Sequence, residues 1–149
     1  MRVDFYHLTS SPVERALPQL LERVAGSGRR AVVMAASPER VEAFNNLLWT
    51  YDPDSWLAHG SQKDGSPTQH PIWITEREEN PNAATILVLT DGMDAAFLAS
   101  FERCLDLFDG ANDAALAAAR ERWKRAKGQG HEMHYWQQKP GGGWAEQGV

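Results

Sequence analysis

Apolar residues along the chain form two kinds of pattern: short continuous runs, and runs repeated at helical spacing. Continuous apolar runs bounded by polar residues predict buried strands. These runs are VDFYHL (3–8), RAVVMAAS (30–37), HPIWIT (70–75) and ATILVLTDG (84–92), with HEMHYWQQ (131–138) as a last candidate strand. Between them, apolar residues three and four apart predict helices from about 12 to 26, from 37 to about 50, over about 94–108 and over about 113–127.

Turn-forming residues mark the ends of the first two helices. Ser10 or Ser11 is placed to cap the first helix, with Pro12 in its first turn and Gly26 at its end. The SP pair at 37–38 starts the second helix in the same way. The side chains expected on core faces are Val41, Phe44, Leu47 and Leu48 of the second helix and Phe97, Leu98, Phe101, Leu105 and Phe108 of the third.

Strands that alternate with helices indicate an α/β fold: a Rossmann-like, mostly parallel sheet flanked by helices, with right-handed crossovers. The turn HLTSSP after the first strand lacks the Gly-x-Gly-x-x-Gly fingerprint, and no Gly-x-x-x-x-Gly-Lys-Ser/Thr loop occurs in the sequence. The fold is therefore expected without nucleotide-binding glycines. We expect one domain over residues 1–138 and a Gly-rich, mobile tail over 139–149.

Composition narrows the classes of function. The net charge of −5 argues against a broad nucleic-acid footprint, which needs clustered Lys and Arg. No apolar run is long enough to span a membrane, and no signal peptide is visible. A single cysteine, Cys104, excludes an intrachain disulfide and fits a reducing cytoplasm. Cys104 lies in the apolar pattern of the third predicted helix, which favours packing over a nucleophilic role.

Candidate catalytic groups remain isolated in the sequence. Asp91 ends a buried strand, where α/β enzymes often carry an acid, but Asp-Gly is also turn chemistry. His131 and His134 would share a metal on a helix, whereas a strand points them to opposite faces. His59 and His70 have no evident partner. We therefore expect no metal and no cofactor; the alternative is a small nucleotide-dependent enzyme that uses Asp91.

The fourth predicted helix carries a basic stripe beside an apolar face. Residues 112–127 hold five basic and two acidic side chains, so this segment carries +3 and the rest of the chain −8. The apolar face comprises Ala115, Leu116, Ala119, Trp123 and Ala126, the stripe Arg120, Lys124 and Lys127, and the other flank Arg122 and Arg125. Such a stripe is either a solvated helix surface or a site for an acidic peptide or carboxylate, which arginine binds as a fork. A third interpretation is direct binding of single-stranded nucleic acid through this helix and Trp123, against which the net charge argues.

Two tryptophans in FNNLLWTYDPDSWLAHG (44–60) call for a separate explanation. Trp49 lies roughly 120° from the core face of the second helix, at 100° per residue. Trp56 follows a turn. Exposed tryptophans dominate protein interfaces, so the pair is either a partner site or a small local core beneath the loop.

These blocks together resemble the chi subunit family of bacterial DNA polymerase III. The resemblance covers nearly the whole chain. The blocks that carry it are FYHL at 5–8, LLW at 47–49, WLAHG at 56–60, LVLTDG at 87–92, FERCLDLFDG at 101–110 and ARERWKRAKGQGHEMHYWQQ at 119–138. The segment ENPN at 79–82 resembles the alphaproteobacterial branch. The segment DGANDAALAA and the residues after Gln138 depart from the family pattern.

The resemblance implies a non-catalytic accessory subunit of the clamp-loader assembly in the replicative polymerase, linked to single-stranded-DNA-binding protein. It implies that the acidic, phenylalanine-ending C-terminal tail of that protein binds at Arg120, Trp123 and Lys124, with Phe108 on the apolar side and Lys127 on the basic flank. It assigns Trp49 and Trp56 to the psi subunit or an equivalent, and to a helicase as a further partner. No direct contact with nucleic acid and no membrane is implied.

Overall fold

The computed structural model describes residues 1–94 and 101–148, which form an eight-stranded sheet in the order β3-β4-β2-β5-β6-β1-β7-β8. All neighbouring strands pair in parallel except β7 and β8, which are antiparallel. The strands are β1 Arg2–Leu8, β2 Ala31–Met34, β3 His59–Ser61, β4 Ile72–Thr75, β5 Ile86–Leu89, β6 Arg103–Asp109, β7 Glu132–Gln138 and β8 Trp144–Gln147.

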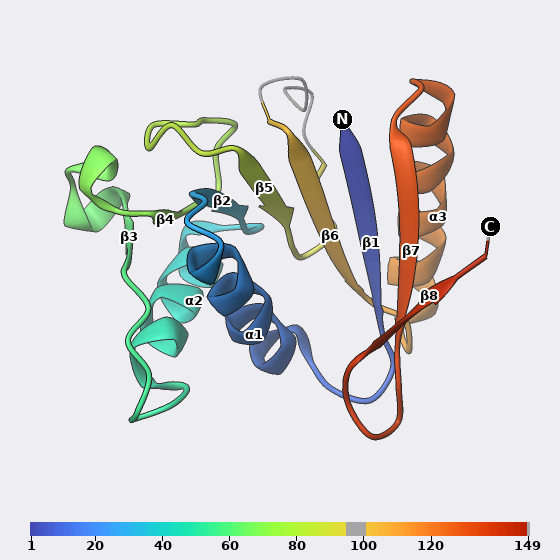
Figure 1. Ribbon diagram of the computed structural model, residues 1–149, viewed down its shortest axis with the longest axis horizontal. Helices are drawn as coiled ribbons and strands as arrows, with labels where there is room; N and C mark the ends of the chain where they lie inside the picture. Colours follow the sequence, from blue (N-terminus) through green and yellow to red (C-terminus); the bar gives the residue numbers. More distant parts are fainter. Residues whose placement is uncertain (95–100, 149) are drawn as a thin grey trace.

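Helices cover both faces of this sheet, as the Rossmann-like prediction requires. In Figure 1, α1 (Val13–Gly26) and α2 (Pro38–Thr50) lie in front of the sheet, and α3 (Asp113–Gly128) lies behind it. Short 3-10 turns, η1 Gln62–Asp64 and η2 Pro67–Gln69, follow β3. No helix in the described residues is long and apolar enough to cross a lipid bilayer.

Alternation along the strands divides the core into two layers. On β1, Tyr6 packs with α1 and α2, whereas Val3 and Phe5 pack on the α3 side. On β2, Val33 packs on the side of α1 and α2, and Val32 packs on the side of α3. This follows from the two-residue period of a strand, whose successive side chains point to opposite faces. The apolar runs of β1, β2, β4 and β5 are therefore strands buried on both faces, whereas β7 is only half-buried.

The prediction of a helix over 94–108 is wrong for its second half, which forms strand β6. Leu105 and Leu107 face α1, while Cys104 and Phe108 face α3. The spacing of apolar residues in this segment fits a helix as well as a strand, and the run contains no β-branched residue. Cys104 is buried and unpaired in β6, and burial raises the pKa of its thiol well above the ordinary value, which suits packing. Phe97 and Leu98 lie outside the described residues.

The start of α1 also differs from the prediction. Pro12 occupies the N-cap position, and no side chain caps the helix. Ser10 and Ser11 instead donate their backbone N–H groups to the side chain of Gln138, whose Nε2 in turn donates to Ser11 Oγ at 2.6 Å. The second helix starts as predicted, with the Ser37 side chain as its cap.

The sheet continues past residue 138 into the segment for which the sequence predicts a mobile tail. β8 pairs with β7, with Gln138 opposite Trp144 and Tyr135 opposite Gln147. Trp144 packs edge-on against Tyr6, with ring centroids 5.0 Å apart. The partial burial of this indole stabilises the pairing of the short strand β8 with the sheet.

Candidate binding sites

Four residues predicted as one site do line one hollow, which we call the α3 pocket. Its volume is about 290 Å³, and it lies between α3 and the face of the sheet at β6 and β7, the two strands on either side of β1. The lining residues are Phe108, Leu116, Ala119, Arg120, Trp123, Lys124 and Tyr135. Helical spacing accounts for the five residues from α3, since positions three and four apart share a face. Lys127 does not line the pocket and is exposed farther along the helix.

Aromatic rings build the apolar side of the α3 pocket. Trp123 meets Phe5 and Tyr135 edge-on, with ring centroids 5.3 and 5.6 Å away. Phe108 is 4% exposed, and its ring centroid lies 6.2 Å from that of Tyr135. Edge-to-face contacts at these distances favour defined ring orientations. The pocket therefore has a preformed apolar wall rather than a loose surface.

Two cations stand at the rim of the α3 pocket. Arg120 is exposed and forms no ion pair with the part of the chain that the structure describes. Lys124 lies 3.6 Å from Glu121, but both side chains are more than two-thirds exposed, and such surface pairs are weak. The rim can therefore offer positive charge to an anion without first breaking a strong pair.

The charge of Arg120 acts to lower the pKa values of two side chains in or beside the aromatic wall, His7 and Tyr135. Burial lowers the pKa of His7, and Arg120 lowers it further. Burial raises the pKa of Tyr135, against a smaller opposing effect of Arg120. The two side chains are hydrogen-bonded, with His7 Nδ1 2.7 Å from the Tyr135 hydroxyl. Sequence reasoning does not identify His7 and Tyr135 as site residues; only the strand alternation of HEMHYW could have pointed to Tyr135.

Arg122 does not belong to the basic surface, although the sequence places it on the basic flank. Its side chain is 7% exposed and forms a two-pronged ion pair with buried Asp106 of β6, at 2.7 and 2.9 Å. Burial raises the pKa of the Asp106 carboxyl, and the hydrogen bonds from Arg122 oppose that rise. This pair fixes α3 to β6 and so holds the two sides of the pocket together.

The tryptophan pair, Trp49 and Trp56, forms a second surface on another part of the molecule. The two residues are 48% and 72% exposed, and their ring centroids are 5.0 Å apart. Trp49 also rests on buried His59, with centroids 4.5 Å apart. His59 is held by the backbone carbonyls of Leu57 and Asn45, at 2.6 and 2.9 Å. The exposure of Trp56 argues against the alternative of a local core beneath the loop.

The loop between the two tryptophans is anchored at its base. Glu22 of α1 accepts hydrogen bonds from the hydroxyl groups of Tyr51 and Ser55, and these bonds lower the pKa of Glu22. The hydroxyl groups of Tyr51 and Ser55 are themselves 2.8 Å apart. The pair is therefore presented by a braced segment, which lowers the entropy cost of binding a partner.

Asp91 is engaged in structural bonds. It sits at φ +56° after β5, accepts the N–H of Ala36 at 3.2 Å, and receives two hydrogen bonds from Arg40 at 3.1 and 2.8 Å. These contacts join the turns after β2 and β5, which supports the turn interpretation over a free acid. His134 lies in β7 between Glu132 and Glu146. Within the described residues, no group of three or more His, Cys, Asp or Glu is placed to hold a metal.

Comparison with known proteins places this chain in a family. Residues 1–134 match the model of the family described as DNA polymerase III chi subunit, HolC. The probable DNA polymerase III subunit chi of Rickettsia prowazekii is 30% identical over 105 residues, which are 70% of this chain and 64% of that protein. The DNA polymerase III subunit chi of Haemophilus influenzae is 28% identical over 138 residues, which are 87% of this chain and 92% of that protein. The chain, with its parallel sheet, α3 pocket and tryptophan pair, belongs to the DNA polymerase III chi subunit family.

Proposed function

We propose that this protein is a non-catalytic, cytoplasmic subunit that links the clamp-loader assembly of DNA polymerase III to single-stranded-DNA-binding protein. The observation that carries the proposal is the α3 pocket, where an apolar aromatic wall stands beside two rim cations. An acidic chain end that finishes in phenylalanine has the complementary chemistry: an aromatic ring, a terminal carboxylate and nearby negative charge.

In the proposed complex, the phenylalanine ring enters the space beside Phe108, Trp123 and Tyr135. The terminal carboxylate meets Arg120 or Lys124, and acidic residues upstream lie along the basic side of α3 toward Lys127. A charge-assisted hydrogen bond contributes about 1.5–3 kcal/mol, and burial of a phenylalanine side chain contributes about as much. These two contacts supply about 3–6 kcal/mol, and the contacts of the upstream acidic residues with α3 must supply the rest of the roughly 8 kcal/mol that corresponds to the micromolar dissociation constant we expect for a single tail. Several tails on one partner oligomer would add avidity.

The tryptophan pair supports a second partner, which we propose is the psi subunit or its equivalent, with a helicase as a further user of the surface. Two adjoining, braced and exposed indoles are the features of an interface hot spot. The two surfaces are built by different elements, α3 with β6 and β7 in one case and α2 with its following loop in the other. Both partners can then be held at once.

Fluorescence anisotropy of a labelled acidic peptide ending in Pro-Phe tests the first half of the proposal. Wild type should bind saturably, and Arg120→Ala should weaken binding by about 10- to 100-fold, the factor equivalent to one charge-assisted hydrogen bond. Arg15→Ala, at an exposed arginine on α1, is the matched control and should bind as wild type does. A peptide with an amidated C-terminus should bind weakly. Absence of saturable binding to wild type would overturn the proposal.

A pull-down from a lysate tests the second half. The Trp49→Ala/Trp56→Ala double variant should lose its polymerase partner while it keeps its affinity for the acidic peptide. If the double variant retained the partner, the proposed role of the tryptophan pair would be refuted, and the proposed role of the α3 pocket would be unaffected.

A further inference from the structure

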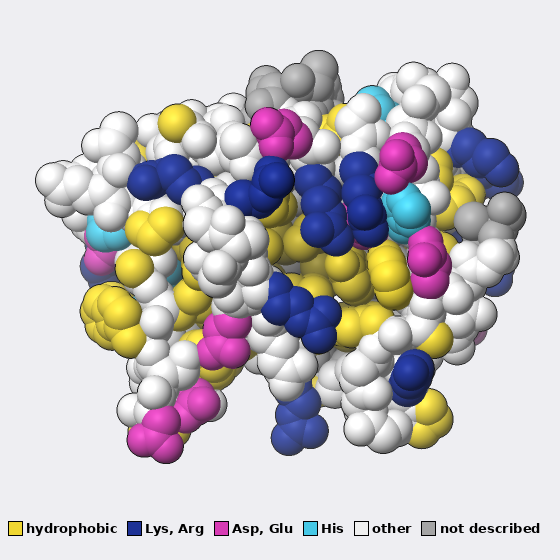
Figure 2. Space-filling model, in the orientation of Figure 1, with side chains coloured by type: hydrophobic (Ala, Val, Ile, Leu, Met, Phe, Trp, Pro, Cys, Tyr) yellow, Lys and Arg dark blue, Asp and Glu magenta, His cyan; other side chains and the backbone are white. Residues whose placement is uncertain are grey.

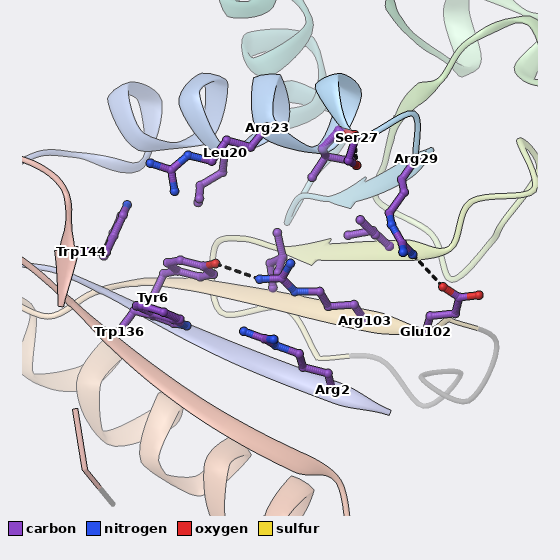
Figure 3. Close-up of a pocket in the computed structure, with 13 residues that line it drawn as sticks. Arg2, Tyr6, Leu20, Arg23, Ser27, Arg29, Glu102, Arg103, Trp136 and Trp144 are labelled. Atoms are coloured by element: carbon purple, nitrogen blue, oxygen red, sulfur yellow. Dashed lines mark hydrogen bonds and ion pairs between the residues drawn. The ribbon is translucent and has the colours of Figure 1, made fainter. Parts of the chain in front are cut away.

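A second and larger hollow lies on the opposite face of the sheet from α3. It has a volume of about 620 Å³ and opens between α1 and the strands β6, β1 and β7, with Trp144 of β8 on its far side. Figure 2 shows it as an apolar floor bordered by Lys and Arg side chains, and Figure 3 shows the residues that line it. We call it the arginine–aromatic hollow, and its main residues are Arg2, Tyr6, Arg23, Arg103, Trp136 and Trp144.

A buried acid organises the arginines of this hollow. Asp4 is fully buried and accepts hydrogen bonds from Arg2 at 3.1 Å and from Arg103 at 2.8 Å. The indole Nε1 of Trp136 donates to the same carboxylate at 2.9 Å. Burial raises the pKa of Asp4, but these three donors together hold it below its ordinary value. One carboxylate thus positions two guanidinium groups, and the cluster of Asp4, Arg2 and Arg103 carries a net charge of +1.

Further positive charge comes from α1. Arg23 is exposed and forms no ion pair with any described residue, and Figure 3 shows its side chain extending along α1 toward the side of the hollow where Trp144 lies. Burial and the Asp4 charge raise the pKa of Tyr6 on the floor of the hollow, and Arg103, Arg2 and, to the smallest extent, Arg23 oppose that rise. Arg29 is neutralised by Glu102 at 2.8 Å. The hollow therefore carries about two net positive charges on a molecule whose total charge is −5.

Flat aromatic surfaces stand next to these charges. The rings of Tyr6 and Trp136 lie nearly parallel, with an interplanar angle of 11° and centroids 6.3 Å apart. Trp144 stands almost perpendicular to Tyr6, at 81°. Trp136 and Trp144 are only half-buried, so each leaves part of an indole facing the hollow.

The hydrogen bonds already made by the arginines distinguish between classes of anion. Recognition of a carboxylate depends on a free guanidinium fork. Arg2 uses Nε and Nη2 on Asp4, and Arg103 uses Nε on Asp4 and Nη2 on the Tyr6 hydroxyl at 3.3 Å. Their side chains are still 39% and 34% exposed, however, and guanidinium planes and indoles are both surfaces on which nucleobases stack. The Arg23 side chain makes no hydrogen bond with any described residue, so its fork is open to a phosphate or to a carboxylate. The stacking surfaces beside it are what favour a nucleotide over a peptide.

We propose that the arginine–aromatic hollow binds a short stretch of single-stranded nucleic acid, one or two nucleotides long. Bases stack on the indole of Trp144 or Trp136 and on the guanidinium planes of Arg2 and Arg103. A backbone phosphate lies against Arg23. The affinity is low and salt-dependent, because the net negative charge of the chain repels the rest of the strand. The hollow therefore binds nucleotides only when another contact already holds the protein next to single-stranded DNA.

The test is fluorescence anisotropy of a labelled oligothymidine with the full chain at low salt, repeated at rising salt. Wild type should bind with a log–log salt slope of about −0.7 to −1.4, the value for one or two phosphates of a single strand. Arg23→Gln should weaken binding several-fold and reduce the magnitude of the slope by about 0.7. Arg15→Gln, the same change at another exposed arginine of α1, is the matched control and should bind as wild type does. Arg120→Gln reports separately whether the α3 pocket contributes to the binding.

A second pair of variants tests stacking without loss of packing. Trp144→Phe should retain most of the affinity, whereas Trp144→Leu should weaken binding about tenfold, the effect of one lost base stack. Circular dichroism confirms that each variant is folded. Three results would overturn the proposal: no saturable binding by wild type, weakening by Arg120→Gln but not by Arg23→Gln, or displacement of the oligonucleotide from the Arg120→Gln variant by an acidic peptide. The last result would show that the hollow is a peptide site.

Discussion

Replacement of Arg122 by methionine would leave the Asp106 carboxylate buried without its counter-ion. The two side chains are 7% and 3% exposed, and they form two hydrogen bonds of 2.7 and 2.9 Å. Removing one partner of a buried pair costs about 3–5 kcal/mol, because the remaining charge stays desolvated. For a domain of this size each kcal/mol lowers the melting temperature by about 2–4 °C. The Arg122→Met variant should therefore melt about 6–20 °C below wild type.

Thermal unfolding followed by circular dichroism measures this difference. Arg125→Met is the matched control, because Arg125 is an exposed arginine of the same helix that pairs with Asp94 at the surface. It should melt within a few degrees of wild type. The double variant Asp106→Leu/Arg122→Met should recover most of the loss, since an apolar pair can replace a buried ion pair.

The pH dependence gives a second signature of the same effect. Without Arg122, burial and the smaller effect of the Asp94 charge act on Asp106 unopposed, so its pKa in the folded state rises further above the unfolded value of about 3.9. Between these two pKa values the folded state holds a proton that the unfolded state has released, so stability falls as the pH rises. The deficit of Arg122→Met should therefore be smallest in acid. An Arg122→Met variant that melts within about 2–3 °C of wild type at neutral pH would refute the reasoning.

Two further predictions concern positions near the proposed sites. Gly110→Ala should lower the free energy of unfolding, measured by urea titration, by about 1–3 kcal/mol, because the new Cβ would lie 1.8 Å from Nε2 of His7. Gly128→Ala is the control and should be neutral or stabilising, because its Cβ would meet no atom within 4 Å. Equal stability of both variants would contradict the close approach of His7 to Gly110. The hydrogen bonds that His134 donates to Glu146 and to Glu132 raise the pKa of His134. The contribution of the Glu146 bond to β8 pairing is therefore complete below the unfolded pKa of about 6.5 and is lost as the pH rises through the folded pKa. Glu146→Gln should lower that pKa in an NMR titration, and an unchanged titration would disprove the link.

The elements that sequence predicts well are those whose pattern is local. The continuous apolar runs correspond to β1, β2, β4, β5 and β7, and the basic helix corresponds to α3. Strand β6 escapes prediction because its signal is not local: Asp106 is tolerated in a buried strand only because Arg122, sixteen residues later, neutralises it. A charged residue in the middle of an apolar run otherwise favours an amphipathic helix.

The same distinction separates the two candidate sites. Arg120, Trp123 and Lys124 share a helix face by spacing alone, so part of the α3 pocket can be predicted from local sequence. Tyr135 completes the wall only because β6 and β7 flank β1 in parallel register. The arginine–aromatic hollow takes its residues from β1, α1, β6, β7 and β8, and no stretch of sequence indicates that strand order.

Six tryptophans allow one measurement to test the central claim, because their indole N–H signals report on different surfaces. Trp123 lines the α3 pocket, Trp49 and Trp56 form the tryptophan pair, and Trp136 and Trp144 line the hollow. Titration of the ¹⁵N-labelled protein with the unlabelled acidic peptide should move the Trp123 signal in a saturable manner and leave the other two groups in place. Shifts confined to Trp49 and Trp56, or to Trp136 and Trp144, would contradict the assignment of the peptide to the α3 pocket.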